Sequence, residues 1–123
     1  MEKQDYMIEY EEFMKNYKLG ATNGEVVGEV IAHMAQYFAH RNMLAVTCER
    51  ILNKEAAQIV SGTDENTGKP ISVSKADIII KATEEARDLK LARAHIENIE
   101  QYINALKYLQ RGLLNEYSYA GTA

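Results

Sequence analysis

The sequence predicts an all-α fold: a long antiparallel helical hairpin, coiled-coil-like, with a short N-terminal helix packed at its open end. Apolar side chains recur every seven residues from about Glu25 to Val60 and again from about Ser74 to Tyr117. One short connection, which contains the only proline, joins these segments, and short connections make consecutive helices antiparallel neighbours. The length of 123 residues fits a single helical domain over residues 1–123.

The first predicted helix covers about residues 4–18. Tyr6, Tyr10, Phe13 and Tyr17 follow one another at steps of three and four residues, which places them on one helix face. Gly20 stands where a left-handed cap ends a helix. The aromatic face is expected to dock on the rest of the bundle, and the alternative is a free surface for a partner protein.

The second predicted helix covers about residues 24–60. Its start matches a capping box, in which Thr22 and Glu25 satisfy each other's backbone N–H groups. The apolar stripe of this helix is wider than a two-stranded coiled coil needs. With Val27 at heptad position a, positions d and e are nearly all apolar: Val30, Tyr37, Leu44, Ile51 and Gln58 at d, and Ile31, Phe38, Ala45, Leu52 and Ile59 at e.

The connection over residues 61–73 is rich in turn-forming residues, among them Gly62, Gly68 and Pro70. A small β-hairpin is an alternative here, but we expect an ordered loop because proline cannot donate a hydrogen bond to a strand ladder. Ser74 is the expected cap of a third helix over about residues 74–117. Its heptad register is predicted to run without a break from Ile78 to Tyr117.

Packing of the two long helices leaves apolar surface uncovered. Pairing facing residues so that their numbers sum to about 134 brings Ile31 beside Ile103 and Phe38 beside Ile96. The first helix is too short to cover the remaining stripe, and a continuous uncovered apolar stripe usually marks an interface. We therefore expect an obligate or near-obligate oligomer, homomeric or heteromeric. The expected interface residues are Tyr6, Tyr10, Phe13, Tyr17, Ile79, Ile80, Leu109 and Leu114.

Composition argues against several partner classes. The formal charge is −4, and no basic run of the kind that binds nucleic acid is present, so we expect no nucleic-acid partner. No stretch of about 18 apolar residues suggests a membrane span. The single cysteine, Cys48, fits a reducing compartment and a structural, buried role. The expected location is the cytoplasm, or the virion if the protein is viral.

No motif predicts catalysis or a cofactor. His40 and His95 face each other in the predicted pairing and are weak metal candidates, but no third ligand stands at a suitable spacing. The loop from Gly62 to Pro70 fails as a phosphate loop, because its glycine spacing is wrong and proline replaces the hydroxyl residue. It also fails as a calcium loop, because Lys75 stands where the bidentate glutamate belongs. We predict no catalytic, cofactor-binding or metal-binding residues.

The stretch Ile96–Arg111, which follows a compact capped hairpin, resembles in style the small helical proteins of tailed-phage particles. This resemblance covers only the hairpin and carries no diagnostic motif. It implies a structural role such as a neck, connector or packaged component.

Three functions are compatible with this sequence. The first is a non-enzymatic structural or assembly subunit that packs through its helix faces. The second is an adaptor or inhibitor that binds one partner protein through the same stripe. The third is a metal-dependent enzyme in which two hairpins dimerise into a four-helix bundle.

Overall fold

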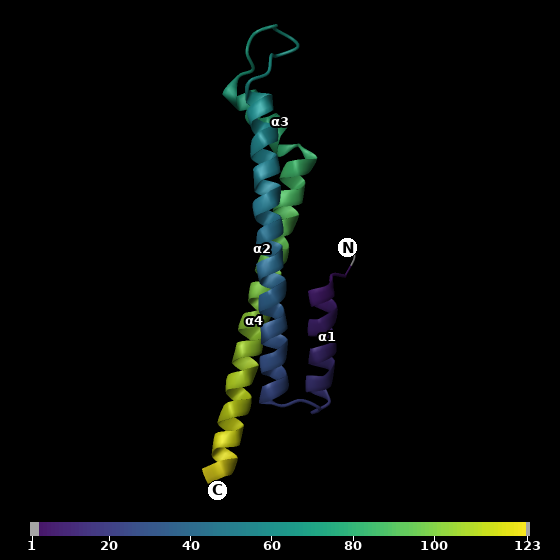
Figure 1. The fold of residues 1–123 in the computed structure, drawn as a ribbon, viewed down its shortest axis with the longest axis vertical. Helices are drawn as coiled ribbons and strands as arrows, with labels where there is room; N and C mark the ends of the chain where they lie inside the picture. The colour runs from purple at the N-terminus through teal and green to yellow at the C-terminus, as the bar shows by residue number, and fades with distance from the viewer. Residues whose placement is uncertain (1–2, 123) are drawn as a thin grey trace. The chain divides into compact units, whose positions relative to one another are not determined.

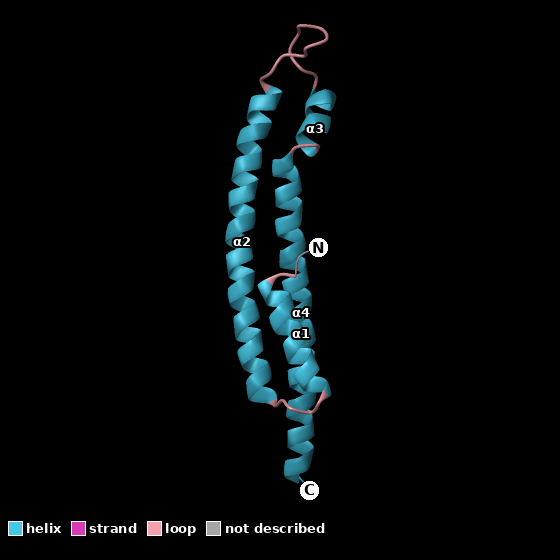
Figure 2. Cartoon of the chain, turned by 90° about the vertical axis from the view of Figure 1, so that its right-hand side faces the viewer, coloured by secondary structure: helices cyan, strands magenta, loops and turns pink. Residues whose placement is uncertain are grey.

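The computed structural model describes residues 3–122, with side chains described for residues 3–115. It contains four helices: α1 (Asp5–Lys18), α2 (Gly24–Val60), α3 (Val73–Lys81) and α4 (Glu84–Thr122) (Figure 1). Within residues 3–122 there is no β-strand, and helices α2 and α4 form the long hairpin beside which α1 packs (Figure 2). The predicted all-α hairpin with a short N-terminal helix is therefore confirmed.

The chain divides into two compact units. The first unit comprises residues 1–40 and 97–123, and the second unit comprises residues 41–96. Helices α2 and α4 both run through the two units, so each unit contains one part of each long helix. Helix α1 belongs to the first unit, and the interhelical loop and α3 belong to the second.

The ends of α1 and α2 are set by local hydrogen bonds. Gly20 has a φ of +72°, its N–H donates to the Tyr17 carbonyl at 3.0 Å, and the Ala21 N–H donates to the Asn16 carbonyl at 2.9 Å. This pair of bonds is a Schellman motif, and the prediction of a glycine cap at this position is confirmed. At the start of α2 the predicted capping box is wrong.

Asn23, and not Thr22, caps helix α2. Its side-chain oxygen accepts a hydrogen bond from the Val26 N–H at 3.0 Å. Asn23 immediately precedes the first helical residue, so its short side chain reaches the free N–H groups of the first turn. The Thr22 hydroxyl is buried and has no hydrogen-bond partner among the described residues.

The predicted single helix over residues 74–117 is also wrong, because two helices share this stretch. Ser72 caps α3 by accepting from the Lys75 N–H at 3.2 Å, two residues before the predicted cap. Thr83 ends α3 and starts α4: its hydroxyl donates to the Ile80 carbonyl at 2.7 Å and accepts from the Ala86 N–H at 3.2 Å. A threonine that satisfies a C-terminal carbonyl and an N-terminal N–H stabilises the break without interrupting the apolar pattern.

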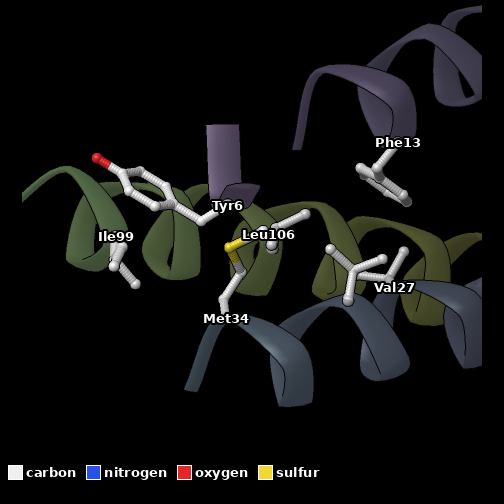
Figure 3. Packing of buried hydrophobic residues seen from close by; sticks show 7 residues of the cluster. Tyr6, Phe13, Val27, Met34, Ile99 and Leu106 are labelled. Carbon is white, nitrogen blue, oxygen red and sulfur yellow. The ribbon is translucent and has the colours of Figure 1, made fainter. Parts of the chain in front are cut away.

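The core of the first unit lies between α1, α2 and α4. Tyr6 and Met34 are fully buried beside Leu106, and Figure 3 shows these side chains converging from the three helices. The whole buried cluster comprises Tyr6, Phe13, Val27, Val30, Met34, Ile99 and Leu106. Because all three helices contribute large side chains, burial in this unit holds α1 on the hairpin.

Cross-helix contacts within each unit report the pairing of α2 with α4. In the first unit the Gln110 side-chain amide donates to the Gly24 carbonyl at 3.5 Å, and these numbers sum to the predicted 134. In the second unit Arg93 lies 3.9 Å from Glu49, and these numbers sum to 142. The two helices are therefore antiparallel neighbours in both units.

Candidate interaction surface

The second unit has little core of its own. Among residues 41–96, all of which are described, only Ala76, Leu89 and His95 are buried. Nine large apolar side chains of the same unit are exposed: Met43, Leu44, Val46, Ile51, Val60, Val73, Ile78, Ile79 and Leu91. A two-helix layer with this balance of buried and exposed apolar surface has the composition of an interaction surface.

Comparison with the first unit shows which face is uncovered. There, α1 packs on heptad positions d and g of the long helices: the Tyr6 ring lies 6.4 Å from the Tyr37 ring, and Tyr10 stacks on Tyr102 with centroids 4.0 Å apart. One and two heptads beyond Tyr37, on the same stripe of α2, come Leu44 and Ile51. These two side chains are 41% and 51% exposed, because no helix within residues 3–122 covers them as α1 covers Tyr37.

Helix α4 contributes the other side of this face. Ala92 lies one heptad before Ile99, at position d, and is half-buried, and its neighbour Leu91 is exposed. We call Leu44, Ile51, Leu91 and Ala92 the uncovered face of the second unit. Its residues hold the heptad positions, or adjoin them, that α1 covers in the first unit.

Charged side chains flank the uncovered face on both helices. On α2, Lys54 lies at position g, and on α4, Glu84, Glu85 and Asp88 occupy the first turns. The carboxylates of Glu84 and Glu85 interact favourably with the positive, N-terminal end of the α4 dipole. None of these four residues forms an ion pair or a hydrogen bond through its side chain within the described part of the chain.

Helix α1 packs in the first unit through tyrosine ring contacts and one polar contact. Glu9 of α1 hydrogen-bonds His33 of α2, and Tyr6 lies 5.9 Å from Tyr102 by ring centroids. Burial, and then the neighbouring Glu9 carboxylate, raise the pKa of Tyr37 above its ordinary value. Burial likewise raises the pKa values of Tyr10 and Tyr102.

These raised pKa values predict alkaline destabilisation of the first unit. A phenol whose pKa is higher in the folded than in the unfolded chain stabilises the fold fully below its ordinary pKa of 10.0. That contribution is lost as the pH rises through the higher, folded-state value. We expect the urea midpoint to fall as the pH rises above about 10, and to fall less in Tyr37→Phe. An equal decline in the variant would contradict this assignment to Tyr37.

The structure separates the predicted interface residues into internal and exposed ones. Tyr6 and Phe13 are buried in the first unit, and Tyr10, Tyr17 and Leu109 are half-buried against its core. These aromatic residues hold α1 in the first unit, where the side chains of Tyr6 and Phe13 are covered. Ile80 is half-buried, and the remaining predicted residues, Ile79 and Leu114, are exposed.

Leu44 and Ile51 are the interface candidates that sequence reasoning missed. The heptad pattern places them at position d of an apolar stripe that is wider than a two-stranded coiled coil needs. The signal that could have found them is the length of α1, which has 14 residues against 37 in α2. A third helix of that length covers the d stripe of α2 over its first half only.

The weak metal candidates are not brought into a ligand cluster. His95 is buried in the second unit and has a bonding partner, and His40 is an exposed residue of the first unit. Among the described residues, no group of three or more His, Cys, Asp and Glu side chains has metal-binding geometry. Cys48 is a half-buried free cysteine.

The interhelical loop is held by Asp64. Its carboxylate accepts from the Lys75 ammonium at 2.9 Å and from the Asn66 N–H at 2.9 Å, and these bonds lower the pKa of Asp64. Thr63 and Pro70 form an isolated bridge, and no strand forms in residues 61–72. The predicted ordered loop is therefore present, and the ammonium of Lys75 lies where a calcium ion would need oxygen ligands.

An open cavity of about 570 Å³ lies in the first unit between the α1–α2 turn and α4. Its lining includes Tyr17, Lys18, Thr22 and Tyr108. Lys18 is the only charged side chain among these lining residues, and Tyr17, Thr22 and Tyr108 add hydroxyl groups.

Comparisons with known proteins assign no family. No family model, no curated protein and no solved structure matches this chain. Within residues 3–122, no helix combines the length and apolarity needed to cross a lipid bilayer. The uncovered face is therefore the feature on which a functional proposal can be based.

Proposed function

We propose that this protein is a non-enzymatic structural subunit that assembles with other protein chains by helix packing. The observation that carries the proposal is the contrast within the second unit, which buries three side chains and exposes nine large apolar ones. Covering apolar surface contributes about 25 cal/mol per Å², so this surface favours association. The pattern of d-position residues suits another helix better than a small molecule.

Membership of a phage particle, as a neck, connector or packaged component, is the finer form of this proposal. It is supported only by the resemblance of residues 96–111 in style to such proteins. The adaptor alternative uses the same face and differs in stoichiometry, because an adaptor is a monomer until its single partner binds. No observation on the described residues favours the metal-dependent enzyme.

The test is self-association of the purified chain. We expect light scattering and native mass spectrometry to show an oligomer at micromolar concentration. Leu44→Glu with Ile51→Glu should weaken association at least about tenfold, because two charges would be buried in the interface, while helix content stays unchanged.

The matched control is Asn53→Glu with Ala57→Glu. Both residues are exposed on α2 at heptad positions f and c, outside the d and g positions that this helix contributes to the uncovered face and its edge. This variant adds the same charge to the same helix and should associate like the parent. A parent chain that remains monomeric at about 500 μM would reject the structural-subunit proposal in favour of the adaptor.

A further inference from the structure

We infer that the uncovered face binds the same face of a second copy, with the two copies parallel, so that four helix segments form one bundle. This inference rests on the proposed function and names the partner and its orientation. In a bundle with a two-fold axis along the helices, α2 of one copy lies beside α4 of its partner. Leu44, Ile51 and Ala92 of both copies would then form the shared core.

The charged residues that flank the uncovered face lie at matching levels along the hairpin. Glu49 and Arg93 approach to 3.9 Å within one chain, so residues whose numbers sum to 142 lie at one level in the second unit. Lys54 and Asp88 also sum to 142. A two-fold axis along the helices keeps every residue at its level, and therefore brings Lys54 of one copy to the level of Asp88 of the other.

Lys54 and Asp88 also match in their heptad positions. Lys54 and Asp88 both occupy position g, and neighbouring antiparallel helices pair their g positions. Glu85 lies at position d beside Asp88, and thus adds a second carboxylate near Lys54 of the other copy. Since Lys54, Glu85 and Asp88 have no side-chain partner among the described residues of their own chain, these contacts would replace water and not existing ion pairs.

The two edges of the uncovered face carry opposite charges. A symmetric interface requires a surface that is complementary to itself. Here the α2 edge presents the Lys54 ammonium and the α4 edge presents carboxylates, so the two-fold axis pairs unlike charges twice. In an antiparallel pair, Lys54 would instead meet the g position of the partner's α2 at another level, and the charges would stay unpaired.

A charge-exchange experiment tests this inference. Lys54→Glu alone and Asp88→Lys alone should each weaken association about tenfold in low salt, because each places like charges together. The double variant restores unlike charges with their positions exchanged and should associate within about threefold of the parent. Circular dichroism on all three variants checks that helix content is kept.

Each result separates the inference from the proposed function. Restoration by the double variant supports the parallel pair of copies. Association that is weakened by Leu44→Glu with Ile51→Glu but unaffected by either charge change would overturn the parallel pair and leave the structural-subunit proposal standing. Association that both single variants weaken and the double variant fails to restore would likewise overturn it. A monomeric parent chain would reject both.

Discussion

Tyr6→Ala should lower the free energy of unfolding of the first unit by about 3–5 kcal/mol. Tyr6 is fully buried, and its ring contacts the tyrosines of both long helices, with centroids 6.4 Å from Tyr37 and 5.9 Å from Tyr102. Removal of the ring leaves a cavity between all three helices. Because α1 is only 14 residues long, we expect this loss to release α1 from the hairpin. Urea unfolding followed by circular dichroism measures the change.

Two variants serve as controls for this prediction. Tyr6→Phe keeps the ring and should cost much less than Tyr6→Ala. Ile8→Ala lies two residues away on the same helix, but Ile8 is 47% exposed, so its truncation should cost less than about 1 kcal/mol. Equal destabilisation by Ile8→Ala and Tyr6→Ala would show that α1 is not anchored by the buried tyrosine.

Hydrogen exchange of the monomeric chain should be much slower in the first unit than in the second. The first unit encloses the seven-residue core cluster, whereas the second unit buries only Ala76, Leu89 and His95 among residues 41–96. The free energy of local opening is lower where fewer apolar side chains are buried. We expect amides near Met34 and Leu106 to open with at least about 2 kcal/mol more free energy than those near Ile51, roughly thirtyfold in exchange rate.

Hydrogen exchange measured at increasing protein concentration tests whether assembly protects the uncovered face. If association covers the uncovered face, exchange near Ile51 and Leu91 should slow with concentration, while exchange near Met34 stays constant. Amides of the exposed opposite side of α2, which lies outside the face, report the stability of the helix itself. Uniform exchange rates in the two units of a monomeric chain would contradict the division into a packed and an uncovered part.

The sequence alone predicts the helices well, because their signals are local. The seven-residue period identifies α2 from its start at Gly24 to its end at Val60, and the glycine at residue 20 identifies the end of α1. The break at Thr83 was missed because the apolar pattern continues through it. The decision between one helix and two depends on the bonds of one hydroxyl, which a periodicity does not report.

The candidate site was predictable only in part. Ile79 and Leu114 were placed among outward-facing residues, and the structure exposes both side chains. Tyr6 and Phe13 carry the same apolar signal as an interface residue, and only the packing of α1 on α2 and α4 shows that they are internal. Leu44 and Ile51 repeat the pattern of Tyr37 one and two heptads later, but their exposure depends on where α1 ends.

The sequence by itself determined which side chains form apolar stripes and that two long helices pair antiparallel, because periodicity and turn chemistry act between near neighbours in the chain. Only the tertiary structure decided which part of each stripe is covered. Coverage is a contact between distant segments: α1 covers d and g positions of the first unit, whereas Leu44 and Ile51, at position d of α2 in the second unit, stay exposed. Burial is cooperative across segments, so residues of one heptad position become core in one unit and surface in the other.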